Sequence, residues 1–206
     1  LSGVKKRVSD NEYLWFRRTF AVPGAWRKQQ ILLNFEASDW ETTICIDGKE
    51  AGKHRGGYDP FTFNITEYLD RKKNHELLVC VRDSSEKGSQ PRGKQVSVAE
   101  GIWYTPTTGI WQTVWIEPVH KSHISSFRSY PDIEKGSVTF TADVVNPGTN
   151  EVHISILRDD KIVASATDNC NNAITLMIPA PKLWTPDIPI LYDVLRELKS
   201  GNKTID

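Results

Sequence analysis

Residues 42–54 have the sequence TTICIDGKEAGKH, and this stretch decides the class of fold. Its central pair, Asp47-Gly48, accepts the positive φ angles that a tight two-residue turn requires. Residues 42–46 and 49–54 flank the pair on either side. The stretch therefore predicts a β-hairpin, the simplest unit of an antiparallel sheet.

Apolar side chains alternate with polar ones on both sides of this hairpin. Successive side chains of a strand point to opposite faces of the sheet, so each alternating run has one apolar face to bury. Residues 77–81 are apolar on both faces, which predicts a strand in the centre of its sheet. The alternating sets are Leu14, Phe16, Phe20 and Val22; Ile31, Leu33, Phe35 and Ala37; and Phe61, Phe63 and Ile65.

The second half of the chain continues in short alternating runs. They cover residues 138–144, 152–156, 162–166 and 174–178, and turn residues such as Asn146-Pro147-Gly148 separate them. Residues 193–199 have a spacing that would also suit a helical turn, and we predict a strand there. Short strands with turns at these intervals are typical of β-sandwiches, so the sequence predicts an all-β protein.

A domain boundary is predicted near residue 119. The β-prone run 111–116 ends at Glu117-Pro118, and six of the seven tryptophans precede this point. We therefore expect an aromatic-rich domain at residues 1–119 and a smaller sandwich at 120–206. Residues 83–101 are polar and contain glycine and proline, and a loop of this length inside a compact domain is usually functional or disordered.

Composition excludes several classes of partner. The 206 residues carry 26 Lys and Arg against 26 Asp and Glu, so no excess of cations favours a nucleic acid or an anionic membrane surface. No apolar run approaches the roughly 18 residues that cross a bilayer. The chain lacks an initiator methionine, so we expect it to be processed or trimmed.

Few residues suggest chemistry of their own. Cys45, Cys80 and Cys170 are too scattered for a disulfide framework, and we expect small buried side chains; a Cys45–Cys80 pairing stays open. The close pair His120 and His123 lacks further metal ligands, so the histidines are expected to be ordinary surface residues and no metal or cofactor is predicted. No Gly-x-Ser-x-Gly nucleophile motif and no phosphate-binding glycine loop is present.

These residues alone indicate a two-domain β protein whose first domain is aromatic and rich in loops. Aromatic faces stack on sugar rings and polar loops supply hydrogen bonds, so composition allows a carbohydrate binder. Tryptophan buried in a sandwich core is the commoner use of such residues.

Five motifs, in order along the chain, resemble the N-terminal portion of glycoside hydrolase family 2, which includes β-galactosidases, β-glucuronidases and β-mannosidases. Together they extend over roughly the whole chain, so their order makes the resemblance specific. The five are YLWFRRTF at 13–20, LNFEASDW at 33–40 leading to IDGKEAG at 46–52, HRGGYDPFTFNIT at 54–66, TGIWQTVWIE at 108–117 and LWTPDIPILY at 183–192.

The resemblance implies a jelly-roll sugar-binding domain followed by an immunoglobulin-like β-sandwich, trimmed at the N- and C-terminal ends respectively. In the family a (β/α)₈ barrel follows, and its two glutamates perform retaining hydrolysis. The Asn-Glu pairs of this chain, at 11–12 and 150–151, lie in turn-like stretches, so the fragment is expected to contain no catalytic residue. It would meet the carbohydrate only through the missing barrel. A homo-oligomer of the intact enzyme is left open, and a periplasmic or secreted location would suit it.

The resemblance also suggests substrate-binding residues. Relatives of the β-galactosidase and β-glucuronidase type supply an aspartate six residues before the glycine of the Gly-Ile pair. Here that position is Trp103, whose ring can stack on a sugar but cannot accept hydrogen bonds from its hydroxyls. We expect Lys94, Trp103 and Tyr104 to approach the substrate, while packing of Trp103 against its own loop is an equally good interpretation.

Other motif residues receive structural predictions. One of Arg17 and Arg18 should be buried and paired, because an unpaired buried charge is costly. Trp184 should close the bottom of the second sandwich or its interdomain face. Two alternatives to the family 2 hypothesis remain: a free-standing carbohydrate-binding module, and a structural or adhesive β-sandwich array.

Overall fold

The computed structural model describes residues 7–70 and 74–206. The chain divides into two compact units, Leu1–Pro118 and Val119–Asp206. Strands dominate both units, so the prediction of an all-β fold is confirmed. Across the described ranges, no helix is long and apolar enough to cross a membrane.

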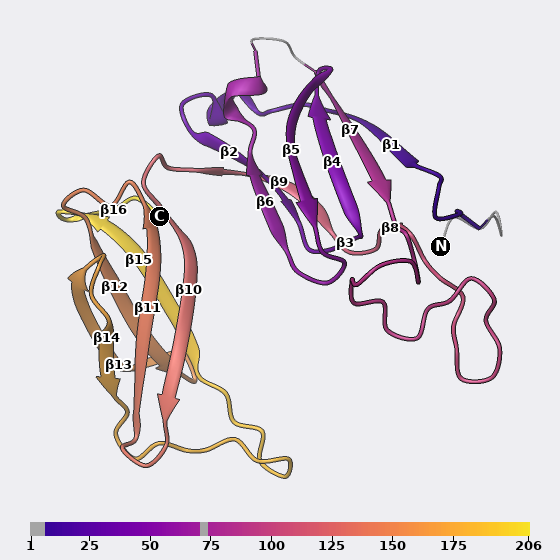
Figure 1. Ribbon diagram of the computed structural model, residues 1–206. Helices are drawn as coiled ribbons and strands as arrows, with labels where there is room; N and C mark the ends of the chain where they lie inside the picture. Colours follow the sequence, from indigo (N-terminus) through magenta and orange to yellow (C-terminus); the bar gives the residue numbers. More distant parts are fainter. Residues whose placement is uncertain (1–6, 71–73) are drawn as a thin grey trace. The chain divides into compact units, whose positions relative to one another are not determined.

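The first unit contains two main sheets (Figure 1). Its strands are β1 (Leu14–Phe20), β2 (Gln30–Phe35), β3 (Ser38–Asp39), β4 (Glu41–Ile46), β5 (Lys49–Arg55), β6 (Phe61–Asn64), β7 (His75–Arg82), β8 (Gly109–Ile110) and β9 (Val114–Val119), with 3₁₀ turns η1 (Gly24–Trp26) and η2 (Thr66–Tyr68). One sheet has the order β1-β7-β4-β5 and the other the order β6-β2-β9, while β3 and β8 form a separate pair.

Local sequence accounts for the centre of the four-stranded sheet. β4 and β5 pair with Ile46 opposite Lys49, and the two turn residues Asp47 and Gly48 have φ angles of 50° and 81°. The predicted hairpin is therefore confirmed. β7, which was expected to be central because both of its faces are apolar, lies between β1 and β4.

The apolar faces of the first unit form one core. Ile31, Leu33, Phe35 and Ala37 are each at most 2% exposed, which confirms the predicted alternation of β2. Phe61 continues the core on β6. Its ring stacks on Phe35 at 4.8 Å between centroids and on His54 at 3.9 Å. This column of three rings joins β2, β6 and the end of β5.

The second unit packs two antiparallel sheets around its own core. Its strands are β10 (His123–Asp132), β11 (Ser137–Val145), β12 (Glu151–Arg158), β13 (Lys161–Asn169), β14 (Ile174–Met177), β15 (Asp193–Ser200) and β16 (Lys203–Thr204). The sheet orders are β10-β11-β14 and β13-β12-β15-β16. Phe140, Ile154 and Leu198 are at most 1% exposed at the centre. Residues 193–199 form a strand, as predicted.

The prediction of a buried arginine in β1 is wrong. Arg17 pairs with Glu76 at 2.5 Å, but its side chain is 75% exposed, and Arg18 is exposed as well. β1 is an edge strand of its sheet, so long side chains on it reach solvent without passing through the core. A surface ion pair of this kind contributes little to stability.

Two histidines also differ from prediction, because they are buried. His75 and His123 are 2% and 7% exposed. The Nδ1 atom of His75 lies 2.7 Å from the Asp47 carboxylate, and that of His123 lies 2.9 Å from the carbonyl oxygen of His120. Such hydrogen bonds offset the cost of removing an imidazole from water.

Two tryptophan predictions need correction. Residues 111–116 do not form one strand, because β8 ends at Ile110 and β9 begins at Val114. In the break, the Trp111 indole donates a hydrogen bond of 2.8 Å to the carbonyl oxygen of Gly57. Trp184 is 57% exposed, so its ring does not close the second sandwich, while the alternative place at the interdomain face stays a prediction.

The three cysteines are free thiols. Cys170 is buried as expected, whereas Cys45 and Cys80 are only half-buried. Both lie on neighbouring strands of the four-stranded sheet, on the face that carries exposed Trp15 opposite Cys80. They are therefore not core side chains.

Candidate functional site

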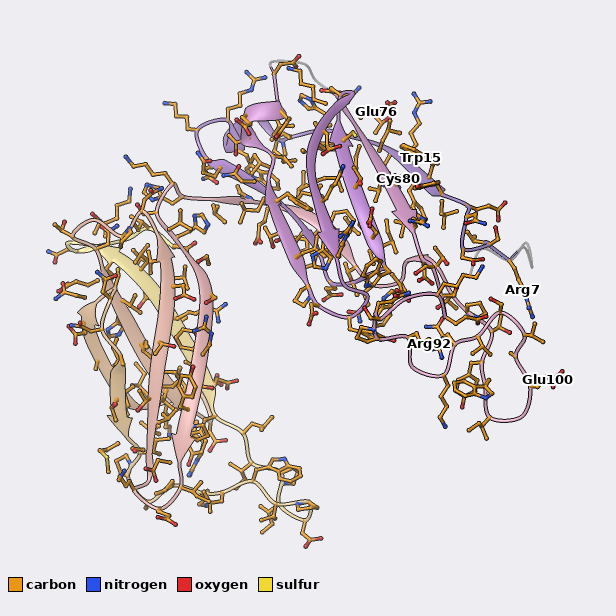
Figure 2. The ribbon with its side chains drawn as sticks, viewed as in Figure 1. Arg7, Trp15, Glu76, Cys80, Arg92 and Glu100 are labelled. Carbon is orange, nitrogen blue, oxygen red and sulfur yellow. The ribbon has the colours of Figure 1, made fainter. Side chains whose placement is uncertain are left out.

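Residues 83–108 form the longest stretch of the described chain without a named strand, and we call it the long loop. Figure 2 labels Arg92 within this loop and Glu100 near its tip. Side chains fix the backbone in several places. Arg92 donates a hydrogen bond of 2.8 Å to the carbonyl oxygen of Glu86, and Arg7 donates one of 3.0 Å to that of Ser97. The loop therefore has a defined path despite its length.

A buried carboxylate holds the start of the long loop to its end. Asp83, directly after β7, is 5% exposed. It accepts a hydrogen bond of 2.8 Å from the backbone N–H of Ser85, and its carboxylate also lies 3.5 Å from the hydroxyl of Thr108. Thr108 immediately precedes β8, so one side chain joins the two ends.

A second buried carboxylate, Asp39, lies beside the first. It belongs to β3 and is 8% exposed. Burial raises the pKa of Asp39 to about 6, the charge of Asp83 adds to the rise, and a hydrogen bond with Gln95 of the long loop opposes it. Gly57 packs against this carboxylate so closely that an added Cβ would lie 2.6 Å from Asp39 Oδ1. The loop, β3 and the turn after β5 therefore meet at Asp39.

This geometry predicts that Asp39→Asn stabilises the chain at neutral pH. The pKa of Asp39 is raised from 3.8 in an unfolded chain to about 6, so the folded state binds this proton more tightly. The resulting stability is fully present below about pH 4 and is lost as the pH rises through 6. At pH 7.5 the variant should gain about 2 kcal/mol in free energy of unfolding, measured by urea titration.

At pH 4.5 the gain should fall by about half or more, since Asp39 is then mostly protonated in the folded protein although still mostly ionised in the unfolded chain. Asp132→Asn is the control with the opposite sign, because hydrogen bonds with Lys135 lower the pKa of Asp132. That variant should lose stability at pH 7.5. An Asp39→Asn gain that is equal at both pH values would contradict the assignment of a raised pKa.

The structure brings together the backbones that carry the three predicted substrate residues. Tyr104 N–H donates a hydrogen bond of 2.7 Å to the carbonyl oxygen of Lys94, and Val96 N–H donates one of 3.0 Å to that of Tyr104. Lys94 is exposed, and the side chains of Trp103 and Tyr104 are 42% and 65% exposed. The three residues thus lie close together along the backbone of the long loop with accessible side chains, and we call them the patch.

Sequence reasoning missed an aromatic pair near this patch. Tyr58 and Trp111 are about half exposed and meet edge to face, with ring centroids 6.3 Å apart. Their positions depend on the hydrogen bond from Trp111 to Gly57. Both residues lie in recognised motifs, 54–66 and 108–117, but no spacing along the chain shows that these two motifs touch.

Among the described residues, no group of three or more His, Cys, Asp or Glu side chains is arranged to hold a metal ion. The fold and the patch define an all-β protein of two units whose first unit exposes aromatic side chains on a long, fixed loop.

Comparison with known proteins gives the family. Residues 5–115 match the model described as "Glycosyl hydrolases family 2, sugar binding domain", and residues 122–206 match the model described as "Glycosyl hydrolases family 2". The chain therefore belongs to glycoside hydrolase family 2, and the resemblance of the five motifs is confirmed.

Curated relatives and solved structures agree with this assignment. A β-galactosidase of Thermoanaerobacter pseudethanolicus is 28% identical over 93% of this chain and 27% of its own length. A putative β-glucuronidase of Formosa agariphila is 27% identical over 93% of the chain and 18% of its own length. The β-glucuronidase structure of Bacteroides uniformis superposes with a TM-score of 0.76 at 25% identity, over 93% of this chain and 25% of that one. The chain thus spans between 18% and 27% of the length of these relatives.

Proposed function

We propose that this chain is the non-catalytic N-terminal portion of a retaining exo-β-glycosidase of the β-galactosidase type, and that it frames the active site of a (β/α)₈ barrel. The observation that carries the proposal is the extent of the match. Two family 2 domains fill this chain, yet they correspond to only 27% of the β-galactosidase relative and 25% of the β-glucuronidase structure.

The carboxylates at the long loop support a structural role for this unit. A retaining glycosidase needs two carboxyl groups about 5 Å apart that both reach the sugar. Asp39 and Asp83 are electrostatically coupled, but both are at most 8% exposed and they bond to loop atoms and to Gln95. The two carboxylates therefore fix the path of the loop, and their burial leaves no open position for a substrate.

Exposed apolar side chains of the second unit support a buttressing role. The loop before β15 and the start of that strand expose six large apolar side chains within 13 residues. A longer polypeptide could cover them. They are Leu183 (52% exposed), Trp184 (57%), Ile188 (59%), Leu191 (76%), Val194 (39%) and Leu195 (51%).

The patch of Lys94, Trp103 and Tyr104 is proposed to form part of the rim of the substrate site. Trp103 offers a partly open ring for stacking on a sugar, and the ammonium of Lys94 can donate hydrogen bonds to sugar hydroxyls. The backbone bonds between residues 94 and 104 hold these groups in one place. Such a rim would contact the sugar only together with a catalytic domain.

The chain by itself is expected to hydrolyse no glycoside. Purified wild-type chain would be incubated with nitrophenyl β-glycosides, including the β-galactoside and the β-glucuronide, and release of nitrophenol would be measured. A full-length family 2 β-galactosidase is the positive control. Turnover that copurifies with the chain and is lost in Asp39→Asn would contradict the proposal, because it would make the carboxylate pair catalytic.

A free-standing carbohydrate-binding module is the second candidate, favoured by the exposed aromatic rings of the long loop. It requires that the patch alone binds an oligosaccharide. Calorimetric titration of the wild-type chain and of Trp103→Ala distinguishes the two. Affinity that disappears with the Trp103 ring supports the module, whereas the framing function expects no contribution from this ring in the isolated chain.

A further inference from the structure

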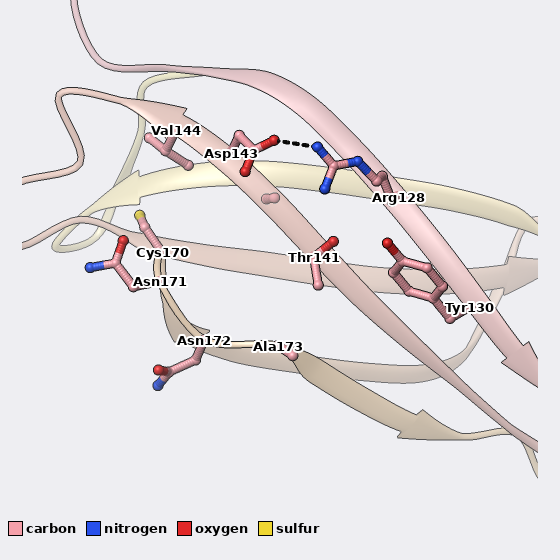
Figure 3. A pocket seen from close by; sticks show the side chains of 10 residues that line it. Arg128, Tyr130, Thr141, Asp143, Val144, Cys170, Asn171, Asn172 and Ala173 are labelled. Carbon is pink, nitrogen blue, oxygen red and sulfur yellow. Dashed lines mark hydrogen bonds and ion pairs between the residues drawn. The ribbon is translucent and has the colours of Figure 1, made fainter.

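The second unit contains a cavity of about 540 Å³ at the place where β14 and β11 stop pairing (Figure 3). The last paired residues are Phe140 and Ile174, but β11 continues to Val145. Residues 170–173 line the opposite side of the cavity. Within this fully described unit, no backbone hydrogen bond joins them to residues 141–145.

The charges that line the cavity cancel one another. Arg128 on β10 donates a hydrogen bond of 2.8 Å to the Asp143 carboxylate on β11, and the two side chains are both 58% exposed. The Ser126 hydroxyl also bonds to this carboxylate. Because the pair is neutral as a whole, the site favours neither a phosphate nor a metal cation. Both partners keep further hydrogen-bonding capacity, since guanidinium has five N–H donors and a carboxylate about four acceptor sites.

One hydroxyl in the cavity wall has no partner. Thr141 Oγ1 is screened from solvent and makes no hydrogen bond among the described residues. Thr139, two residues earlier on the same face of β11, bonds to Thr175 of β14 at 2.8 Å. The pairing with β14 ends before Thr141, so no side chain of β14 reaches this hydroxyl, and a ligand in the open cavity would not reach it either.

The remaining lining suits the mixed surface of a sugar. Tyr130 is 52% exposed and offers a ring face, which packs well on the C–H face of a pyranose. Asn171 and Asn172 add amide groups, which both donate and accept hydrogen bonds. Asn172 uses one amide hydrogen on Asp168, at 2.9 Å, and keeps its carbonyl oxygen.

We propose that this cavity is a binding site for a neutral monosaccharide or disaccharide. Its volume lies in the range of ligand pockets, about 300–1,000 Å³, and exceeds what one pyranose fills. Apolar side chains are too few for a lipid. This proposal concerns the second unit and is independent of the long loop. Either it or the proposed framing function can therefore fail while the other holds.

Chemical-shift mapping tests the proposal. The ¹⁵N-labelled chain would be titrated with galactose and with lactose up to about 50 mM, because a small open polar site should bind at about the millimolar level. Shifts should be confined to amides at 128–130, 141–144 and 170–173. Inorganic phosphate and glucuronate are the charged comparisons and should bind more weakly than the neutral sugars.

Two pairs of variants assign the contacts. Tyr130→Ala should weaken sugar binding at least about fivefold, while Tyr104→Ala, which removes an exposed ring of the long loop, should leave it unchanged. Asn171→Ala removes an exposed amide group of the lining and should weaken binding at least about threefold without loss of thermal stability. Thr141→Val removes a hydroxyl that solvent does not reach and should leave affinity unchanged.

Three results would overturn the proposal. The first is no shift at the cavity with either sugar over the whole titration. The second is a sugar response confined to residues 94–104, which would move binding to the long loop. The third is a response of amides 141–145 to an extended hexapeptide but to no sugar, which would assign the open edge of β11 to strand addition.

Discussion

Phe35→Ala is expected to lower the free energy of unfolding of the first unit by about 3–5 kcal/mol. Phe35 is completely buried, and its ring stacks on Phe61 with an interplanar angle of 7°. Removing the ring leaves a cavity under the column that continues through His54, so the neighbouring rings lose packing as well. Urea unfolding followed by tryptophan fluorescence measures the loss, because six of the seven tryptophans lie in this unit.

Trp15→Ala is the matched control. It removes a larger aromatic side chain that is 62% exposed on β1, so the change in stability should stay within about 0.5 kcal/mol. Phe35→Leu should fall between the two variants, since it keeps most of the buried volume. A Phe35→Ala protein as stable as Trp15→Ala would mean that the described core is wrong.

Asp47→Ala should destabilise the first unit by about 2–4 kcal/mol, for two independent reasons. The carboxylate lies 2.7 Å from Nδ1 of buried His75 and accepts a bond of 2.9 Å from the backbone N–H of Glu76, and alanine offers neither contact. The residue also has a φ of 50°, which alanine adopts only with strain. The unfolding midpoint in urea gives the measurement.

Asp47→Asn separates the two contributions. Asparagine tolerates the left-handed conformation and keeps one carbonyl acceptor, so it should recover at least half of the stability that alanine loses. Equal losses for the two variants would show that the carboxylate charge, and not the turn, dominates. No loss in either variant would contradict the hydrogen bonds between Asp47 and the start of β7.

Much of the fold follows from local sequence. The Asp47-Gly48 pair predicted the hairpin, because the conformation of a tight turn depends on the turn residues themselves. Alternation predicted the buried faces of residues 31–37 and 138–144, since side-chain direction in a strand has a period of two. Residues 77–81 were expected in the middle of a sheet because a strand that is apolar on both faces must be covered on both.

The failures share a cause, which is that partners distant in the chain decide burial. Arg17 is exposed because β1 lies at the edge of its sheet, and no local pattern gives strand order. His75 is buried because Asp47, 28 residues earlier, provides its hydrogen bond. Trp111 interrupts a β-prone run because its indole N–H bonds to Gly57, 54 residues away.

The sequence located the segment that carries the candidate site, but it did not predict which residues of the site contact one another. Composition singled out residues 83–101, and the family resemblance added Lys94, Trp103 and Tyr104; their contact with a sugar stays a prediction. Asp39 and Asp83 could not be chosen among 26 acidic residues, because their coupling exists only where β3 meets the end of β7.

By itself, the sequence determined the all-β class, the position of the central hairpin and membership of glycoside hydrolase family 2. These properties depend on periodicity, turn residues and ordered motifs, all of which are local along the chain. Only the tertiary structure decided which carboxylates share a buried site, how the long loop is closed and where β11 loses its partner. Those features depend on distances between residues far apart in sequence, and packing sets such distances only once the two sandwiches have formed.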